Sequence, residues 1–227
     1  MKILAVETCT EACSVALLSE NGLQERYKLA PREHTELVLP MTQELLQEAG
    51  LELRDLDAIA VSIGPGAFTG VRVGLSMAQG LALPHELPLV GINTLEAMAW
   101  RHLRKHPSDK VGCCLDARMG EVYFASYSRS EITFDELQSP LICSPDQLSE
   151  QLGEDSPAMD ILLGHGLLTY PEIQNMFNCD HVDKDVLPRA GDVARLARLY
   201  HPHWENYPAT PLYLRNNVAK KSSKPLF

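Results

Sequence analysis

The hydrophobic and polar positions along the chain predict short strands that alternate with amphipathic helices. Apolar runs bounded by polar or turn residues predict strands at 3–6, 13–18, 24–29, 59–63 and 90–92. Between 34 and 49, apolar residues recur at spacings of three and four, which predicts a helix closed by Gly50. Two further helices follow, one from 70 to about 84 and one that Thr94 is expected to cap. This alternation is typical of an α/β fold.

A similar pattern begins after the polar turn at 107–109, which we interpret as a linker. The second half is predicted to contain strands at 111–115, 122–127 and 161–163 and a late helix at 192–200. Each half opens with a strand, a short turn with a carboxylate at its start, and a second strand. We therefore predict a duplicated α/β fold with lobes at 1–107 and 108–227, a C-terminal segment free to pack back on the first lobe, and an interlobe cleft suited to ligands. The tail at 220–225 is expected to be flexible.

The most distinctive segment is Gly64-Pro65-Gly66-Ala67-Phe68-Thr69-Gly70-Val71-Arg72, which joins a predicted strand to a predicted helix. Its glycine spacing does not match a Walker loop, and no lysine follows it. It also departs from the dinucleotide-binding fingerprint, because three residues separate Gly66 from Gly70. The segment is therefore interpreted as a turn that sets the direction of the helix.

Small residues line one side of the helix that follows, since Gly70, Gly74 and Ala78 are four positions apart. Such a stripe lets another element approach closely. Packing against the chain's own sheet is one account. We favour the other, in which the stripe faces a second subunit while the larger side chains face the sheet: Val71, Leu75 and Leu81.

Composition narrows the range of functions. The formal net charge is −10 and the isoelectric point is about 5.2, so the chain lacks the broad cationic surface that would hold a nucleic acid by itself. Six cysteines form no C-x-x-C pair, which favours reduced core residues over a metal or disulfide framework. An early carboxylate at Glu7 argues against a signal peptide, and no apolar run is long enough for a membrane span. A cytoplasmic location is expected.

Five segments together resemble the bacterial TsaB family, also called the YeaZ family: 3–8, 34–40, 64–72, 115–118 and 213–215. The resemblance implies the fold shared by actin, sugar kinases and heat-shock ATPases, with two lobes that each hold a mixed sheet and helices and a reduced second lobe. It further implies a non-catalytic subunit that is required for threonylcarbamoylation of the adenosine beside the anticodon of ANN-decoding tRNAs. Such a subunit binds and activates the catalytic protein TsaD, works with the ATPase TsaE, and meets tRNA only through the complex.

The resemblance also implies that the chain has no cofactor or metal of its own, because ATP and metal come through the partner subunits. TsaD is credited with two metal-binding histidines four residues apart on a helix, and the equivalent segment here has His34 but Val38. Where related sequences usually have Asp, this chain has Glu7, to which we assign no catalytic role. The expected interface, for TsaD and for a homodimer in isolation, comprises His34, Leu37, Met41, Leu45, Gly70, Arg72, Gly74, Met77, Ala78 and Leu81.

A second hypothesis from a different class is an ATP-dependent small-molecule kinase or ATPase that uses the interlobe cleft. Asp116 would hold Mg²⁺ and Arg118 a phosphate, although we favour a local ion pair between the two side chains. His165, between two glycines, is placed to approach a ligand in the cleft, although the turn alone explains the glycines. Arg72 would hold a phosphate at the helix N-terminus or, as we favour, contact a carboxylate of a partner or of its own chain.

Overall fold

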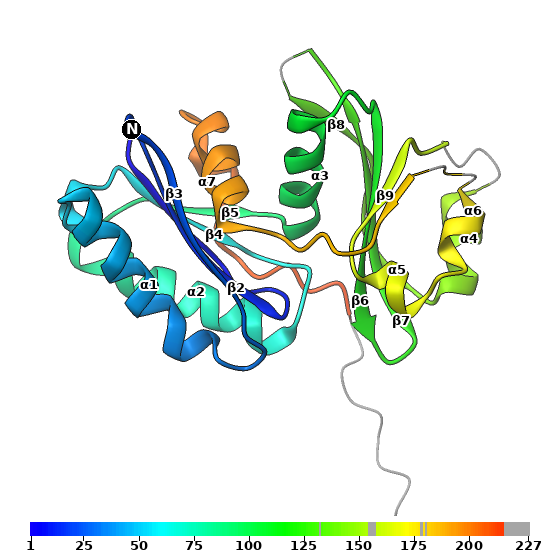
Figure 1. Cartoon of the computed structure of the whole chain (residues 1–227), viewed down its shortest axis with the longest axis horizontal. Coiled ribbons are helices and arrows are strands. Elements are labelled where there is room, and N and C mark those ends of the chain that lie inside the picture. The colour runs from blue at the N-terminus through cyan, green and yellow to red at the C-terminus, as the bar shows by residue number, and fades with distance from the viewer. Residues whose placement is uncertain (132, 154–157, 178, 180, 216–227) are drawn as a thin grey trace, which may run out of the picture.

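Two five-stranded sheets form the body of the molecule, each with helices on both faces (Figure 1). The structure is a computed structural model, and it describes residues 1–131, 133–153, 158–177, 179 and 181–215. The tail predicted to be flexible, at 220–225, lies outside these residues.

The first sheet has the strand order β3-β2-β1-β4-β5. Strand β1 is antiparallel to β2 and parallel to β4, so the sheet is mixed. The predicted strands at 13–18 and 24–29 form a hairpin, in which Ser19 of β2 pairs with Gly22 of β3. The strands are β1 (Ile3–Glu7), β2 (Ala12–Ser19), β3 (Gly22–Leu29), β4 (Ala58–Ser62) and β5 (Leu89–Ile92).

The second sheet repeats this topology. Its order, β10-β9-β6-β7-β8, is that of the first sheet when the strands are matched in sequence order. As in the first sheet, its first strand is antiparallel to the second and parallel to the fourth. The predicted duplication is therefore confirmed at the level of topology. The strands are β6 (Lys110–Arg118), β7 (Glu121–Arg129), β8 (Phe134–Cys143), β9 (Ile161–Leu163) and β10 (His181–Asp183).

Helices cover both faces of each sheet. The outer face of the first sheet packs against α1 (His34–Ala49) and α2 (Phe68–Ala82). The outer face of the second sheet packs beside α4 (Pro145–Leu152), α5 (Gly166–Thr169) and α6 (Ile173–Met176). Short 3-10 turns are η1 (Leu53–Asp55), η2 (Leu83–His85) and η3 (Trp204–Asn206). None of the described helices is both long enough and apolar enough to cross a membrane.

The two inner helices are exchanged between the halves of the chain. Helix α3 (Thr94–Lys105) precedes the second sheet, yet Leu95, Met98 and Leu103 pack against that sheet. Helix α7 (Ala190–Leu199) follows the second sheet, yet it covers the inner face of the first one. The exchange is visible in Figure 1, where both helices lie between the sheets. The lobes therefore share their inner layer.

The cap predicted for α3 is shifted by one residue. Thr94 is the first residue of the helix, and Asn93 is its N-cap. The Asn93 side-chain oxygen accepts hydrogen bonds from the backbone N–H groups of Leu95 and Glu96, at 2.9 and 3.4 Å. Both residue types are good caps, so the sequence alone did not separate them.

The small-residue stripe of α2 faces inward, so the outward orientation that we favoured is wrong. A Cβ on Gly70 would lie 2.1 Å from the carbonyl oxygen of Thr8, and one on Gly74 would lie 2.5 Å from the Thr8 hydroxyl. Ala78 is fully buried in the core beneath α1 and α2. The Thr8 hydroxyl also donates to the Gly70 carbonyl at 2.8 Å. The stripe lets α2 approach the turn after β1, because a larger side chain would collide with it.

Two other members of the expected interface are buried as well. Leu45 has no exposed surface and Met41 is 8% exposed, because both belong to the core between α1 and the first sheet. Leu37, Met77 and Leu81 are half-buried at the edge of the same core. These three keep an accessible edge, whereas Leu45 and Met41 do not.

Candidate functional site

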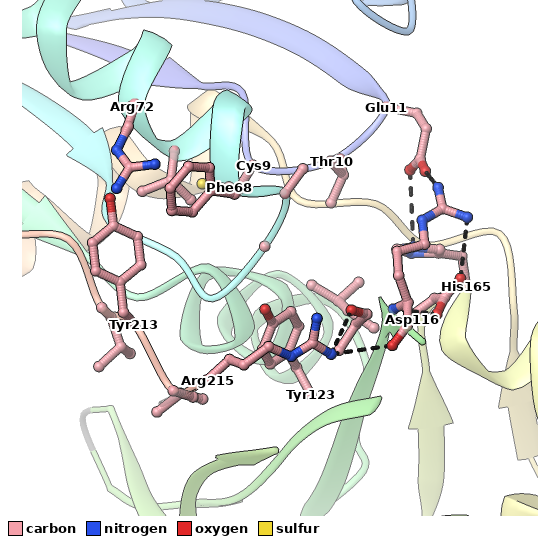
Figure 2. A pocket seen from close by; sticks show the side chains of 18 residues that line it. Cys9, Thr10, Glu11, Phe68, Arg72, Asp116, Tyr123, His165, Tyr213 and Arg215 are labelled. Atoms are coloured by element: carbon pink, nitrogen blue, oxygen red, sulfur yellow. Dashed lines mark hydrogen bonds and ion pairs between the residues drawn. The ribbon is translucent and has the colours of Figure 1, made fainter. Parts of the chain in front are cut away.

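A cavity of about 530 Å³ opens between the two lobes (Figure 2). The first lobe contributes the turn after β1 and the start of α2, including Thr10, Phe68 and Arg72. The second lobe contributes the end of β6 and the start of β7, including Asp116 and Tyr123. This volume is within the usual range for sites that bind small molecules. The predicted interlobe cleft is therefore present.

The last described segment of the chain closes one side of the cavity. Leu212 donates its backbone N–H to the carbonyl of Ile63 in the first lobe, at 2.8 Å. Three residues later, Arg215 donates to the backbone carbonyls of Ala117 and Arg118 in the second lobe, at 3.0 and 3.1 Å. Arg215 also contacts the carboxylate of Glu121. The segment therefore spans both lobes, and the Arg215 guanidinium contacts three oxygen atoms of the second lobe.

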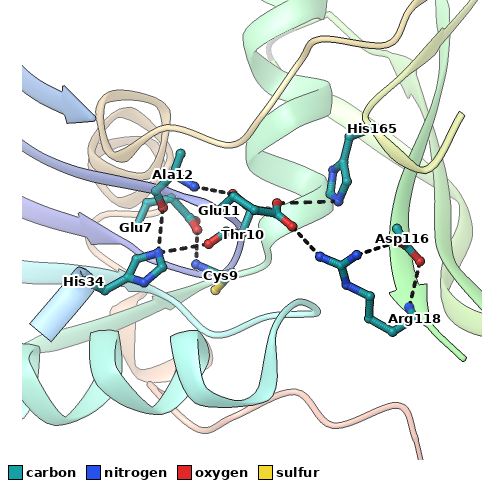
Figure 3. A network of polar contacts seen from close by, with 9 residues as sticks. All are labelled: Glu7, Cys9, Thr10, Glu11, Ala12, His34, Asp116, Arg118 and His165. Atoms are coloured by element: carbon teal, nitrogen blue, oxygen red, sulfur yellow. Dashed lines mark hydrogen bonds and ion pairs between the residues drawn. The ribbon is translucent and has the colours of Figure 1, made fainter. Parts of the chain in front are cut away.

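Asp116 and Arg118 lie together at the opposite end of the cavity, and they form the local ion pair that was one of the two readings (Figure 3). The Asp116 carboxylate accepts the backbone N–H of Arg118 at 2.8 Å and lies 3.3 Å from its guanidinium. A residue of the other lobe joins them, because Arg118 also donates to Glu11 at 2.7 Å. Sequence reasoning missed Glu11, which is 107 positions away.

His165 borders the same network. Its Nε2 lies 3.8 Å from the Glu11 carboxylate, and its Nδ1 is buried with no hydrogen-bond partner among the described residues. Burial lowers the pKa of this imidazole, while the nearby carboxylates of Glu11 and Asp116 act in the opposite direction. His165 lines the cavity, and nothing in the structure distinguishes a ligand contact from a role in the turn alone.

Glu7 lies behind the cavity and is fully buried. One carboxylate oxygen accepts the backbone N–H of Cys9 at 2.6 Å, while the other has no partner among the described residues. Burial raises the pKa of Glu7 to about 7, and the nearby Ser62 side chain and the Cys9 amide oppose this. Burial also raises the pKa of the Cys9 thiol, which keeps it from acting as a thiolate nucleophile.

His34 has a structural role at the start of α1. Its Nε2 lies 2.9 Å from the carbonyl oxygen of Thr10 and 3.2 Å from that of Ala12 (Figure 3). Val38, one turn further on, is fully buried in the core. The imidazole therefore ties α1 to the turn between β1 and β2. Within the part of the chain that the structure describes, no three His, Cys, Asp or Glu side chains form a group that could hold a metal ion.

Arg72 lies at the mouth of the cavity beside two aromatic rings. Its guanidinium carbon is 3.2 Å from the ring centre of Phe68 and 5.1 Å from that of Tyr213. The two rings are 5.8 Å apart and about half exposed, at 52% and 44%. No carboxylate of a described residue pairs with Arg72, so the favoured contact is not met within that part of the chain. Sequence reasoning singled out neither ring.

One relative aligns with almost the whole chain. The tRNA threonylcarbamoyladenosine biosynthesis protein TsaB of Escherichia coli is 40% identical over 227 residues, which cover 97% of each protein. The chain belongs to the TsaB (YeaZ) family. Two solved Pseudomonas aeruginosa structures, YeaZ and a protein with similarity to peptidase YEAZ, match with TM-scores of 0.81 and 0.85. They are 34% and 36% identical, and each match covers 94% of this chain and 99% of the other.

A family model for TsaD, described as tRNA N6-adenosine threonylcarbamoyltransferase, matches residues 25–187. This range includes all of the second sheet and β4 and β5 of the first sheet, and it leaves out β1 and β2. The resemblance predicted from the five sequence segments is therefore confirmed, as is the two-lobed fold with a mixed sheet in each lobe.

Proposed function

We propose that the chain is a non-catalytic subunit of tRNA threonylcarbamoyladenosine biosynthesis that binds and activates a TsaD-type catalytic subunit. Membership of the TsaB family supports the pathway, because the E. coli relative is named for it. In this proposal ATP and metal enter through TsaD-type and TsaE-type partners, and tRNA is bound by the complex. With a net charge of −10, the chain is poorly suited to hold tRNA alone.

The observation that carries the proposal is the engagement of His34. A catalytic metal site of the kind credited to TsaD needs two imidazoles on one helix face, with nitrogen atoms free to bind the ion. Here the Nε2 atom of His34 contacts two backbone carbonyls, and the position four residues later holds buried Val38. The segment supports packing rather than metal chemistry.

The accessible side of α1 and α2 supports a partner role. Leu39 on α1 is 47% exposed, and Leu83 at the end of α2 is 79% exposed. Nothing lies within 4 Å of a Cβ placed on Gly80, so that side of α2 is open. Exposed large apolar residues on neighbouring helices suit a helix-to-helix interface. We propose this surface for the TsaD-type partner and for a homodimer in isolation, with Leu37, Arg72, Met77 and Leu81 at its edges.

Reconstitution tests the function. The other purified proteins of the pathway are incubated with tRNA, threonine, bicarbonate and ATP, with and without this chain. We expect modification of tRNA to fall sharply when the chain is omitted. An undiminished rate without it would contradict the proposal.

A matched pair of variants tests the surface. Leu83→Asp places a charge in the proposed interface, whereas Leu168→Asp makes the same change on α5, where the leucine is 58% exposed. We expect Leu83→Asp to weaken association with the TsaD-type subunit by at least about tenfold, since an unpaired charge would be buried there. Leu168→Asp should bind as the unchanged chain does. Equal binding by both variants would place the interface elsewhere.

The kinase or ATPase hypothesis is supported by the cavity alone. Its proposed metal ligand, Asp116, already accepts from Arg118, and Arg118 is also held by Glu11. Calorimetry of the isolated chain with Mg-ATP distinguishes the two functions. Tight binding that is lost in Asp116→Asn would favour the enzyme, and the absence of heat would favour the partner role.

A further inference from the structure

The three arginines that line the interlobe cavity differ in whether they have a hydrogen-bonding partner of opposite charge. At one end, Arg118 is held by Glu11 and Asp116. On the side closed by the C-terminal segment, Arg215 is held by Glu121 and by two backbone carbonyls. Among the described residues that line the cavity, Arg72 is the arginine that has neither an ion pair nor a hydrogen bond. The cavity therefore presents one available positive charge, at its mouth.

The position of Arg72 leaves its hydrogen-bond donors available. Its guanidinium stacks close to the ring of Phe68, with Tyr213 beside it. Stacking uses the face of the guanidinium plane, while the N–H groups point outward along its edge. A fixed guanidinium edge matches the two oxygens of a carboxylate, which it binds through parallel hydrogen bonds. The aromatic contacts thus orient Arg72 before any anion binds.

The remaining wall favours a flat apolar body. The rings of Phe68 and Tyr213 lie beside Arg72, Tyr123 lines the second lobe, and aliphatic side chains complete the apolar lining (Figure 2). The residues of this lining are Phe68, Val71, Leu115, Tyr123, Leu212 and Tyr213. Because aromatic rings pack well against both kinds of wall, an aryl group would bury its surface here.

We propose that the interlobe cavity binds a small aromatic carboxylate, with its aryl group between the lobes and its carboxylate on Arg72. A single charge is matched by the single available guanidinium. A triphosphate carries several charges, and the arginines that would balance them are already paired within the chain. The aryl group binds between the lobes rather than on the outer side of α1 and α2, and the two proposed sites share Arg72, which lies at the edge of the surface proposed for the TsaD-type partner.

Calorimetric titration of the full chain with 2-naphthoate tests the site, with 2-naphthamide as the uncharged probe of the same shape. We expect one naphthoate per chain and at least about tenfold weaker binding of the amide, as for the loss of a charged hydrogen-bonded pair. Arg72→Gln should weaken naphthoate at least tenfold and remove the preference for the acid. Arg54→Gln, on η1 and remote from the cavity, is the matched control and should change nothing.

A second variant separates binding in the cavity from binding elsewhere. Ala67 is exposed and lines the mouth, so Ala67→Trp fills the entrance without disturbing the core. It should weaken naphthoate at least tenfold while leaving the melting temperature unchanged. The proposal is overturned if naphthoate does not bind, if acid and amide bind equally, or if either cavity variant binds as the unchanged chain does. Mg-ATP binding that displaces naphthoate and is lost in Asp116→Asn would also overturn it, in favour of a nucleotide.

Discussion

The guanidinium of Arg118 reaches across the cleft to the carboxylate of Glu11, with 2.7 Å between nitrogen and oxygen. The two residues lie at equivalent places in the duplicated fold, Glu11 in the turn between β1 and β2 and Arg118 at the end of β6, where the turn to β7 begins. Asp116 fixes the guanidinium from its own side. The pair therefore joins the two lobes at one end of the cavity.

This contact is expected to contribute little to stability. The side chain of Arg118 is 70% exposed, and solvent weakens such pairs. A double-mutant cycle with Glu11→Gln and Arg118→Gln should give a coupling free energy below about 1 kcal/mol, decreasing further in 1 M NaCl. Urea unfolding of the four proteins measures it. A coupling above about 2 kcal/mol would mean that the pair is much less hydrated than its exposure indicates.

Two glycines of α2 should respond in opposite ways to alanine. Gly70→Ala places a methyl group against the Thr8 carbonyl, and we expect it to lower the free energy of unfolding by about 2–3 kcal/mol. Gly80→Ala meets nothing and should raise that free energy by roughly 0.5–1 kcal/mol, because alanine favours the helix. Thermal and urea denaturation report both changes. Equal effects would show that the inner face of α2 is less tightly packed than the distances indicate.

Glu7 should make stability depend on pH. Its pKa in the folded chain is about 7, above the ordinary value of 4.5, so the folded state holds the proton more tightly than the unfolded state. Its stabilising contribution is therefore complete below about pH 4.5 and is lost as the pH rises through 7.

Glu7→Gln keeps a carbonyl oxygen for the Cys9 amide and removes the titration. Relative to the unchanged chain, its free energy of unfolding should increase between pH 4.5 and pH 8, by up to about 3 kcal/mol. Urea unfolding at several pH values measures the difference, and Glu96, whose pKa burial also raises to about 7, acts equally in both proteins. Parallel pH profiles would show that Glu7 is not the group responsible.

The cysteines should be unreactive in the folded chain. All six side chains are buried, and burial raises the pKa of Cys9, Cys13, Cys113, Cys114 and Cys143. Because the thiolate is the reactive form, an aromatic disulfide reagent at pH 8 should modify the native protein at least about a hundredfold more slowly than the protein in guanidinium. Rapid modification of one thiol without denaturant would identify a cysteine that local opening exposes.

Local patterns predicted most of the first lobe and missed part of the second. The strand at 3–6 was predicted from a continuous apolar run and the helix at 34–49 from its periodicity, and both are present. Strand β8 was not predicted, because it is an edge strand with polar residues such as Asp135 and Glu136 and with Pro140 near its end. Edge strands face water, so their apolar pattern is weak.

The orientation of α2 and the residues that form the cavity could not be predicted from local sequence, because both depend on contacts between distant parts of the chain. A stripe of small residues has the same sequence whether it meets another subunit or the carbonyl of Thr8, which lies 62 positions away from Gly70. Asp116 and Arg118 are close in sequence and were found together. Phe68 and Tyr213 come together only in the folded chain, and no periodicity connects them.

The exchange of α3 and α7 affects whether either half of the chain could fold as a separate fragment. A chain cut at Pro107 would leave the first sheet without α7 and the second without α3, so each fragment would expose an apolar face that only the other fragment covers. Although the two sheets repeat one topology, neither half is a self-sufficient folding unit. Each half of the duplicated fold supplies the helix that covers the inner face of the other half's sheet.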